Sequence, residues 1–282
     1  MKPLVRSLAA WLAWCLTTAQ LYAQTGSGAR RGRLHVATYN VAGLPEGLSL
    51  VHPVANLPRV GRLLNGYDLA LVQEDFAYPA LLRSNLRVPY RSTAFVRGEA
   101  LHFGDGLSQF GKLPFGETTR IPWRACHGVI DSYFDCLTPK GLALIRVEVS
   151  PGLLIDVYDV HLDAGAAAGD RTARAAQLVQ LMDTIRLLSA EHAVIVAGDF
   201  NLTEAERPSL YALGASVGLV DACARLHCPE PWRLDRILTR SSRRLFLQPR
   251  AWRLDRSFRD VEGRPLSDHL LVAVDLDWST RD

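Results

Sequence analysis

Residues 193–203, with the sequence AVIVAGDFNLT, constrain the fold of this chain more than any other stretch. The apolar residues at its start predict a buried strand, and Gly198 marks the end of that strand. Asp199 and Asn201 follow two residues apart, so an extended backbone points both side chains to the same side. A carboxylate and a carboxamide at a strand end suit a hard cation and a phosphate oxygen. Taken alone, the same residues would equally suit an ordinary turn.

Other segments predict a fold of short strands with helices between them. Further strands are expected at 34–40, 69–73, 141–149, 153–162, 234–239 and 270–276. Their aliphatic and β-branched composition is typical of strands, and residues 141–149 and 153–162 should pair as an antiparallel hairpin. Apolar residues spaced by three and four predict a helix over 171–188, with others near 54–64, where Pro58 would lie in the first turn, and over 207–217. This pattern predicts an α+β sandwich, two sheets packed face to face with helices outside.

The first residues have the pattern of a secretory signal peptide. Two basic residues precede an apolar run over 8–16, and small residues permit cleavage after Ala23. The run is short for a transmembrane helix, which is the alternative interpretation. The expected division is a signal peptide over 1–23, a linker over 24–32 and one domain over 33–282. We therefore expect a secreted or periplasmic protein.

Cysteine usage agrees with export. Cleavage after residue 23 would leave four cysteines, which are Cys126, Cys136, Cys223 and Cys228. An even number in an exported chain predicts disulfides, although four free buried thiols are the alternative. Of the three pairings that four cysteines allow, proximity in sequence favours Cys126–Cys136 and Cys223–Cys228.

Composition indicates a globular chain and gives little support to a nucleic-acid partner. The sequence is 48% hydrophobic and 22% charged, which is enough apolar material for a sizeable core. The formal net charge is only +3. Residues 233–264 are nevertheless dense in arginine. We favour a solvated face whose long side chains cover apolar surface, with binding of phosphate or anionic lipid as the alternative.

Acid, amide and imidazole side chains recur at the strand ends. They are Asn40, Glu74, Asp159, His161, Asp199, Asn201, Asp235, Asp268 and His269. Each alone has an ordinary structural explanation, but together they suggest a site built on one sheet edge. Oxygen donors of this kind suit Mg²⁺ or Mn²⁺ better than zinc. A histidine beside an aspartate supplies a general base.

The motifs as a set resemble a known superfamily. TYNVAGLPEG, LVQEDF, KGLALIRVEV, YDVHLDAG, AGDFNL, LDRIL and LSDHLLV occur in that order over most of residues 34–276. They resemble the endonuclease/exonuclease/phosphatase superfamily, which has the DNase I-like fold, and within it the secreted bacterial neutral sphingomyelinases. The cysteine-containing insert before Lys140 and the His161 strand followed by a long helix carry the second likeness. The resemblance implies a four-layer α/β sandwich of two packed, mainly antiparallel sheets flanked by helices.

The resemblance also implies a role for each site residue. The expected metal ligands are Glu74, Asn40, Asp199 and Asp268, holding Mg²⁺ with Mn²⁺ or Co²⁺ as substitutes. The expected catalytic and substrate-binding residues are His269 as general base, Asp235 to orient it, Asp199 and Asn201 to position the nucleophile and the phosphate, and His161 and Lys140 to contact the phosphate or the leaving group.

The expected activity is metal-dependent hydrolysis of a phosphodiester by in-line attack of water, converting sphingomyelin to ceramide and phosphocholine. Three alternatives stay open, which are a secreted endonuclease, a phosphoinositide or other phosphatase, and a binding module without activity. The sequence shows no aromatic-tipped apolar hairpin of the kind that some bacterial sphingomyelinases press into membranes. We expect a monomer without a stable protein partner, acting on phospholipid at a membrane surface or on nucleic acid.

Overall fold

The computed structural model describes residues 29–95, 103–129 and 132–280. The expected signal peptide and most of the expected linker lie outside the described residues. Residues 31–282 form one compact unit. None of the described helices is both long enough and apolar enough to cross a membrane.

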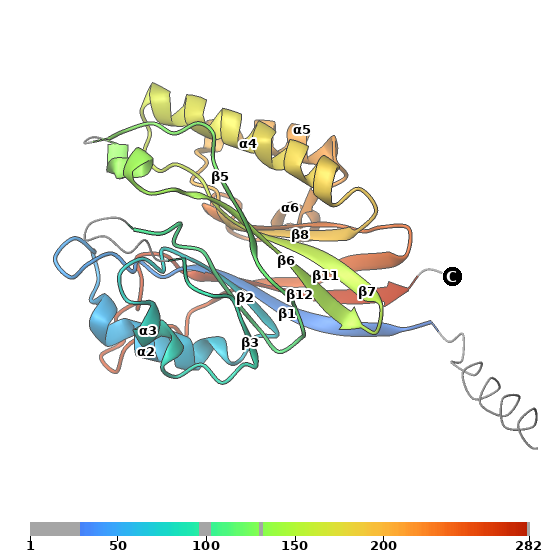
Figure 1. The fold of residues 1–282 in the computed structure, drawn as a ribbon, viewed down its shortest axis with the longest axis horizontal. Helices are drawn as coiled ribbons and strands as arrows, with labels where there is room; N and C mark the ends of the chain where they lie inside the picture. Colours follow the sequence, from blue (N-terminus) through green and yellow to red (C-terminus); the bar gives the residue numbers. More distant parts are fainter. Residues whose placement is uncertain (1–28, 96–102, 130–131, 281–282) are drawn as a thin grey trace, which may run out of the picture. The chain divides into compact units, whose positions relative to one another are not determined.

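Two six-stranded sheets form the centre of the unit (Figure 1). The first contains, in spatial order, β11 (Leu245–Asp255), β12 (Leu271–Thr280), β1 (Arg31–Asn40), β2 (Leu69–Gln73), β4 (Ser108–Gly111) and β3 (Tyr90–Arg91). The second contains β5 (Thr119–Pro122), β6 (Gly141–Ser150), β7 (Leu153–His161), β8 (Ala193–Asp199), β10 (Asp235–Arg240) and β9 (Val220–Asp221). The pairs β1–β2 and β7–β8 are parallel and all other neighbours are antiparallel. The sheets are therefore mixed, with antiparallel pairs in the majority.

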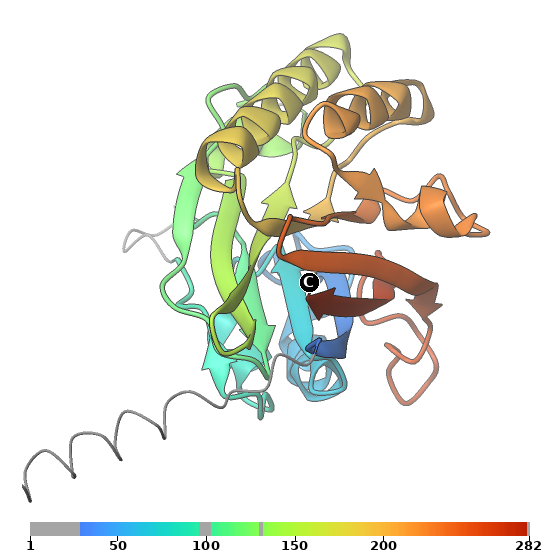
Figure 2. The ribbon, with the colours of Figure 1, turned by 90° about the vertical axis from the view of Figure 1, so that its right-hand side faces the viewer.

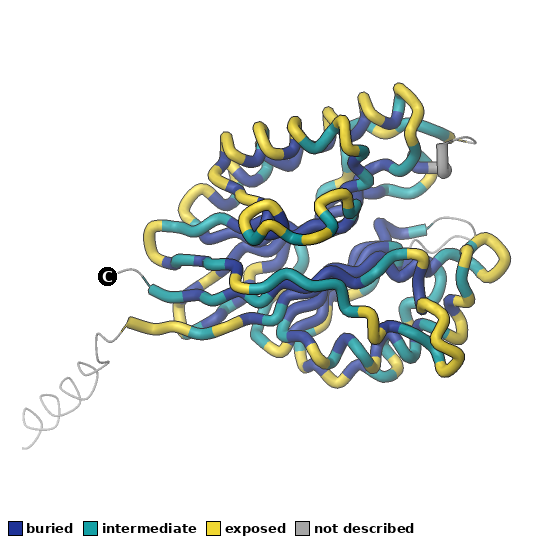
Figure 3. The backbone as a smooth tube through the Cα atoms, turned by 180° about the vertical axis from the view of Figure 1, so that it is seen from behind, coloured by how far each residue is buried: buried dark blue, intermediate teal, exposed yellow. Residues whose placement is uncertain are grey.

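Helices cover the outer faces of both sheets. Figure 2 shows α4 (Ala168–Leu188) and α5 (Arg207–Ala215) on one side of the pair, with α2 (Pro53–Leu64) on the other. The remaining helical elements are α3 (Pro79–Arg83), α6 (Ala222–Leu226) and the 3₁₀ turns Ser132–Leu137 and Glu204–Glu206. One apolar cluster fills the space between the sheets, one lies under α2 and one lies under α4. The burial pattern in Figure 3, with exposed outer helix faces over buried strands, is that of a four-layer α/β sandwich.

The observed elements confirm the expected α+β sandwich. All seven expected strands form, and residues 141–150 pair with 153–161 as an antiparallel hairpin. One detail of α2 was wrong. The helix begins at Pro53, so Pro58 lies in the helix interior and not in the first turn. Pro53 takes the first position, where the missing proline N–H leaves no hydrogen bond unmade.

Both expected disulfides are present. Cys126 is bonded to Cys136 and Cys223 to Cys228, with Cα–Cα distances of 5.4 and 4.8 Å. The first closes a loop next to β6, and the second closes the short segment that contains α6. The structure thus adopts the pairing that proximity in sequence favoured.

Candidate active site

The ends of five strands deliver the candidate site residues to one edge of the sandwich. β1 ends at Asn40 and its parallel neighbour β2 runs directly into Glu74. In the second sheet, His161 at the end of β7 is level with Asp199 on the parallel strand β8. Asp235, at the start of the antiparallel strand β10, is level with Asp199 on its other side. The register of both sheets therefore places these side chains together.

Asn40 joins two carboxylates of the site, the buried Asp199 and the partly buried Glu74. Its Nδ2 donates to Glu74 Oε1 at 2.8 Å and to Asp199 Oδ2 at 3.1 Å. Its Oδ1 accepts the backbone N–H of Ala42 at 3.0 Å, which fixes the amide orientation. Burial raises the pKa of Glu74 and of Asp199. The two acids are thus held together, and solvent reaches only Glu74.

The chemistry of these donors fits a hard divalent cation. Within the described part of the chain, neither Glu74 nor Asp199 forms an ion pair with a lysine or an arginine, and the Nε2 atoms of His161 and His269 lie 3.7–3.9 Å from their oxygens. Carboxylate and amide oxygens are the ligands that Mg²⁺ and Mn²⁺ prefer. Asp268, the fourth expected ligand, is exposed and its Oδ1 accepts from Ser267 Oγ at 3.2 Å. The structure brings Asn40, Glu74 and Asp199 together and leaves Asp268 at the rim.

The backbone around this cluster is locally strained. Glu74 and Asn201 have φ values of +60° and +50°, in the left-handed region that few residues other than glycine adopt. Glu74 is the residue after β2, and Asn201 lies two residues after the end of β8. Strained backbone of this kind concentrates at functional sites.

His269 and Asp235 form a buried pair beside Asp199. His269 Nδ1 lies 2.8 Å from Asp235 Oδ2, and its Nε2 lies 3.7 Å from Asp199 Oδ2. Because the carboxylate can only accept, Nδ1 carries the proton and Nε2 is free to take one. Burial lowers the pKa of His269, but the charges of Asp235 and Asp199 outweigh that effect and raise it well above its ordinary value. This is the arrangement of a general base held by an aspartate.

One ligand atom from each of Asp199, Asp235 and His269 lies within 4.8 Å of the others, so this group could also be considered as a metal site. His269 Nδ1 is bonded to Asp235, so it cannot bind a metal ion at the same time. The arrangement is compatible with proton transfer by His269 and Asp235 and with a cation on Glu74 and Asp199. Asn40 turns its NH₂ group, which cannot bind a cation, toward both carboxylates.

Ser267 forms hydrogen bonds to the backbone on which the His269–Asp235 pair depends. Its hydroxyl donates to the backbone oxygen of Asn40 at 2.7 Å and accepts the backbone N–H of His269 at 3.1 Å. The contact ties the segment before β12 to the end of β1. The sequence analysis did not single out Ser267, although its place directly before Asp268 and His269 could have suggested a supporting role.

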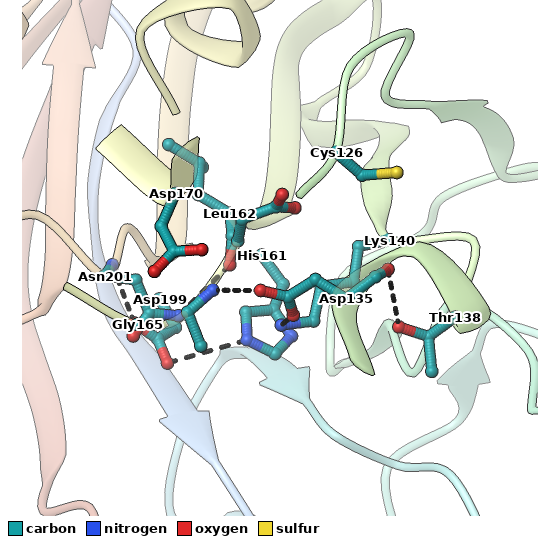
Figure 4. Close-up of polar contacts among 12 residues, drawn as sticks. Cys126, Asp135, Thr138, Lys140, His161, Leu162, Gly165, Asp170, Asp199 and Asn201 are labelled. Carbon is teal, nitrogen blue, oxygen red and sulfur yellow. Dashed lines mark hydrogen bonds and ion pairs between the residues drawn. The ribbon is translucent and has the colours of Figure 1, made fainter. Parts of the chain in front are cut away.

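In Figure 4, Asn201 lies beside Asp199, and His161 lies between Asp199 and the segment that carries Asp135 and Lys140. His161 Nε2 is 3.7 Å from Asp199 Oδ2, and its buried Nδ1 has no hydrogen-bond partner. Burial, together with the charges of Lys140 and His269, holds the pKa of His161 well below its usual value, so its imidazole is neutral. Asn201 Nδ2 donates to the backbone oxygen of Leu162 at 3.1 Å, which orients its amide.

Lys140 is buried next to the site but is not free. Its ammonium forms an ion pair with Asp135, and the other oxygen of Asp135 accepts the backbone N–H of Ala164 at 2.6 Å. The neighbouring disulfide closes the loop on which Asp135 lies. Asp135 was not predicted, because nothing in the local sequence shows which acid the lysine will meet.

Asp159 lies behind the site and not in it. Although it precedes His161 by two residues, its carboxyl accepts from Gln73 Nε2 at 2.6 Å and from Gln109 Nε2 at 2.8 Å. These bonds join the two sheets, since Gln73 and Gln109 belong to the first and Asp159 to the second. Burial raises the pKa of Asp159 well above its ordinary value.

Most arginines of residues 233–264 are already engaged. The partners are Glu230 for Arg233 and Arg256, Asp221 for Arg236, Asp277 for Arg250, Asp275 for Arg253, and Asp260 with Glu262 for Arg264. Arg240 and Arg259 donate to backbone oxygens. This segment therefore presents little uncompensated positive charge, which agrees with the favoured structural interpretation.

Comparisons with known proteins identify the family. Residues 37–269 match the model of the Endonuclease/Exonuclease/phosphatase family. The chain is 32% identical over 269 residues to a sphingomyelinase of Mycobacterium tuberculosis, covering 86% of this chain and 52% of that protein. It thus spans about half the length of the curated relatives that it matches first. The chain belongs to the Endonuclease/Exonuclease/phosphatase family, as its motifs suggested.

Solved structures share the fold. Zebrafish (D. rerio) TDP2 in complex with a single-stranded DNA product has a TM-score of 0.65 at 20% identity, covering 87% of this chain and 99% of that one. A variant of beta toxin from Staphylococcus aureus with bound magnesium ions has a TM-score of 0.61 at 17% identity, covering 86% and 99%. Identities this low support the fold alone. They confirm the expected DNase I-like sandwich.

Proposed function

We propose that this chain is a secreted or periplasmic, Mg²⁺-dependent phosphodiesterase that hydrolyses sphingomyelin to ceramide and phosphocholine. The observation that carries the chemistry is the His269–Asp235 pair, whose free Nε2 faces Asp199 beside the Asn40–Glu74 cluster. The sphingomyelinase relatives support the substrate. The two disulfides support an oxidising compartment.

Each site residue has its own role in the proposed reaction. His269 Nε2 takes a proton from water as the water attacks phosphorus in line and the P–O bond to ceramide breaks, and the leaving oxygen takes a proton from solvent. Asp235 holds the proton on Nδ1 and stabilises the imidazolium. Asn201 and neutral His161 hydrogen-bond the phosphate oxygens. Lys140, held by Asp135, supplies a positive charge at the edge of the site. Such preorganised groups stabilise charge that develops during the reaction.

A metal ion fits this scheme through the residues already described. Glu74 and Asp199 would hold Mg²⁺, while Asn40 orients both carboxylates through its NH₂ group. When bound, the ion would act as a Lewis acid that neutralises charge on the phosphoryl and leaving oxygens.

A nuclease is the second candidate, and one observation favours it. A groove of about 730 Å³ runs from Asp268 along α2 and is lined by Arg59 and Arg62. Within the described residues neither arginine forms an ion pair, and Arg59 Nε is buried without a hydrogen-bond partner. Free guanidinium groups beside the site could bind the phosphates of a nucleic acid.

A single experiment separates these activities. Sphingomyelin vesicles and plasmid DNA are offered in parallel to the purified protein, with Mg²⁺ or with EDTA, and His269→Ala serves as the control. We expect release of phosphocholine that requires both Mg²⁺ and His269. Cleavage of DNA with intact vesicles would move the function to nuclease, and activity on neither would overturn both candidates.

A further inference from the structure

A tryptophan with a largely uncovered side chain lies at the mouth of the candidate active site. Trp232 is 60% exposed and lines a cavity of about 200 Å³ together with Asp268 and His269. No other aromatic ring of the described residues stacks on its indole. Single exposed apolar side chains are common on protein surfaces, but Trp232 lines the same cavity as His269, where a bound ligand could cover the indole.

The turn that carries Trp232 is fixed by hydrogen bonds to its backbone, although the indole itself is exposed. The backbone oxygen of Pro231 accepts from Arg207 Nη1 at 2.6 Å and from Arg236 Nη2 at 2.9 Å. Arg236 is itself buried in an ion pair with Asp221. The backbone next to Trp232 is therefore held in place, which lowers the entropy lost when a ligand binds.

Two acids and one arginine line this cavity, which are Asp235, Asp268 and Arg233. Asp235 is bonded to His269, whereas Asp268 is exposed, with its Oδ1 3.2 Å from Ser267 Oγ. Arg233 Nε and Nη2 both donate to Glu230 Oε2, at 2.9 and 2.6 Å, and Glu230 also pairs with Arg256. The aromatic face of Trp232 and the exposed carboxylate of Asp268 are thus available to a ligand.

We propose that Trp232 and Asp268 form the subsite for the quaternary ammonium of a choline headgroup. The inference rests on the proposed function, since it concerns the substrate of the same site. A trimethylammonium group donates no hydrogen bonds, so it is recognised by an aromatic face and by a nearby negative charge. Choline carries this group two carbons from its phosphate ester, so the cation stays in the cavity that His269 lines while the phosphate occupies the centre.

An exposed tryptophan beside a lipid-cleaving site could instead anchor the protein to a membrane, because indole favours the interface. The two roles differ in one respect. Headgroup recognition acts on any choline ester, including a small soluble one, whereas anchoring acts only on vesicles. A soluble substrate therefore separates them.

The test compares two soluble esters that differ only in charge. They are p-nitrophenyl phosphocholine and its isostere p-nitrophenyl 3,3-dimethylbutyl phosphate, in which an uncharged carbon replaces the quaternary nitrogen and only the phosphate charge remains. We expect the unmodified chain to favour the choline ester by about three- to thirtyfold in kcat/KM, the range of a cation–π contact with a nearby charge. The ratio should fall towards one in Trp232→Ala, mainly through KM, and stay intermediate in Trp232→Phe. Asp268→Asn should lower the same ratio whatever its absolute rate.

Leu187→Ala provides a matched control. Leu187 is 81% exposed on α4 and lies in none of the site contacts described above, so the ratio of the two esters should not change. Binding of phosphocholine and of 3,3-dimethylbutyl phosphate, measured by calorimetry with Mg²⁺, provides a readout that needs no turnover. Trp232→Ala should remove the preference for phosphocholine.

The possible outcomes separate the subsite from the proposed function. An unchanged ratio in Trp232→Ala would overturn the subsite, as would a loss seen only on sphingomyelin vesicles, which would indicate anchoring. If neither sphingomyelin nor the choline ester is hydrolysed, the proposed function fails. Calorimetry then decides the subsite alone, and equal binding of the two phosphates would refute it.

Discussion

Replacing Asp235 by asparagine tests the assignment of His269 as the general base. Asp235 is 3% exposed, and its Oδ2 lies 2.8 Å from His269 Nδ1. The carboxylate keeps the proton on Nδ1 and leaves Nε2 free, 3.7 Å from Asp199. An asparagine has almost the same shape, but its amide can donate to Nδ1 and so favour the tautomer whose Nε2 is already protonated.

The structure favours this unproductive orientation of the amide. Asp235 Oδ1 is buried without a hydrogen-bond partner. If the asparagine oxygen faced His269, its NH₂ group would occupy that place with no acceptor, which costs about 1–3 kcal/mol. The opposite orientation leaves only a carbonyl unpaired. We therefore expect Asp235→Asn to lower kcat by about 10²- to 10⁴-fold, the full contribution of general base catalysis, which is about 3–5 kcal/mol of barrier.

The measurement is kcat and KM on the substrate that the unmodified chain hydrolyses, at fixed Mg²⁺ over a range of pH. Asp183→Asn is the matched control, because Asp183 is exposed on α4 and its loss should leave kcat unchanged. The charge of Asp235 also helps to raise the pKa of His269, so the acidic limb of the pH profile, along which the base loses its proton, should move to lower pH in the variant. A folded Asp235→Asn protein with more than a third of the original kcat would refute the assignment.

Three further substitutions test the cation cluster, the inter-sheet network and the buried ion pair. Glu74→Gln should weaken Mg²⁺ binding by about 100-fold or more, measured by calorimetry, and unaltered affinity would exclude Glu74 as a ligand. The pKa of Asp159 is raised in the folded chain, so the folded state holds a proton that the unfolded state releases, and stability falls as pH rises above the unfolded pKa. Asp159→Asn should therefore gain free energy of unfolding relative to the parent from pH 5 to pH 8 in urea titrations, and a constant difference would contradict this. Asp221→Ala leaves the guanidinium of Arg236 buried without its partner and should lower the free energy of unfolding by about 3–5 kcal/mol, whereas a loss below about 1 kcal/mol would show that the pair contributes little.

The strands that could be predicted are those whose side chains are buried on both faces or alternate clearly. Residues 193–199 are buried throughout, and their apolar run was readable without any partner. β11 was missed, because its sequence LFLQPRAWRLD mixes arginine and proline with apolar residues and only one of its faces reaches the core. β3 and β9 have two residues each, so their pairing depends on neighbouring strands and not on their own pattern.

The site could be predicted as far as the residues lie at strand ends within recognisable motifs. Asn40 and Glu74 lie side by side because of the register of the first sheet, whereas Asp199 meets them through the packing of the second sheet against the first. Asp135 and Trp232 could not be placed in this way. Asp135 lies in the 3₁₀ turn Ser132–Leu137 and Trp232 in the turn before β10, where no periodicity in the sequence shows which groups will be in contact.

The charges of the site explain why its parts depend on one another. Burial disfavours the ionised forms of Glu74 and Asp199, while Asp199 and Asp235 together favour the protonated form of His269. A general base must be neutral, so these acids hold the imidazole in the wrong state for catalysis unless another positive charge offsets them. Lys140 is paired with Asp135, and its charge does not bring the pKa of His269 down to its ordinary value. On the proposed function, a divalent cation on Glu74 and Asp199 would both stabilise their charges and disfavour protonation of His269. The residues proposed to hold the metal would then also make the base available when the metal binds.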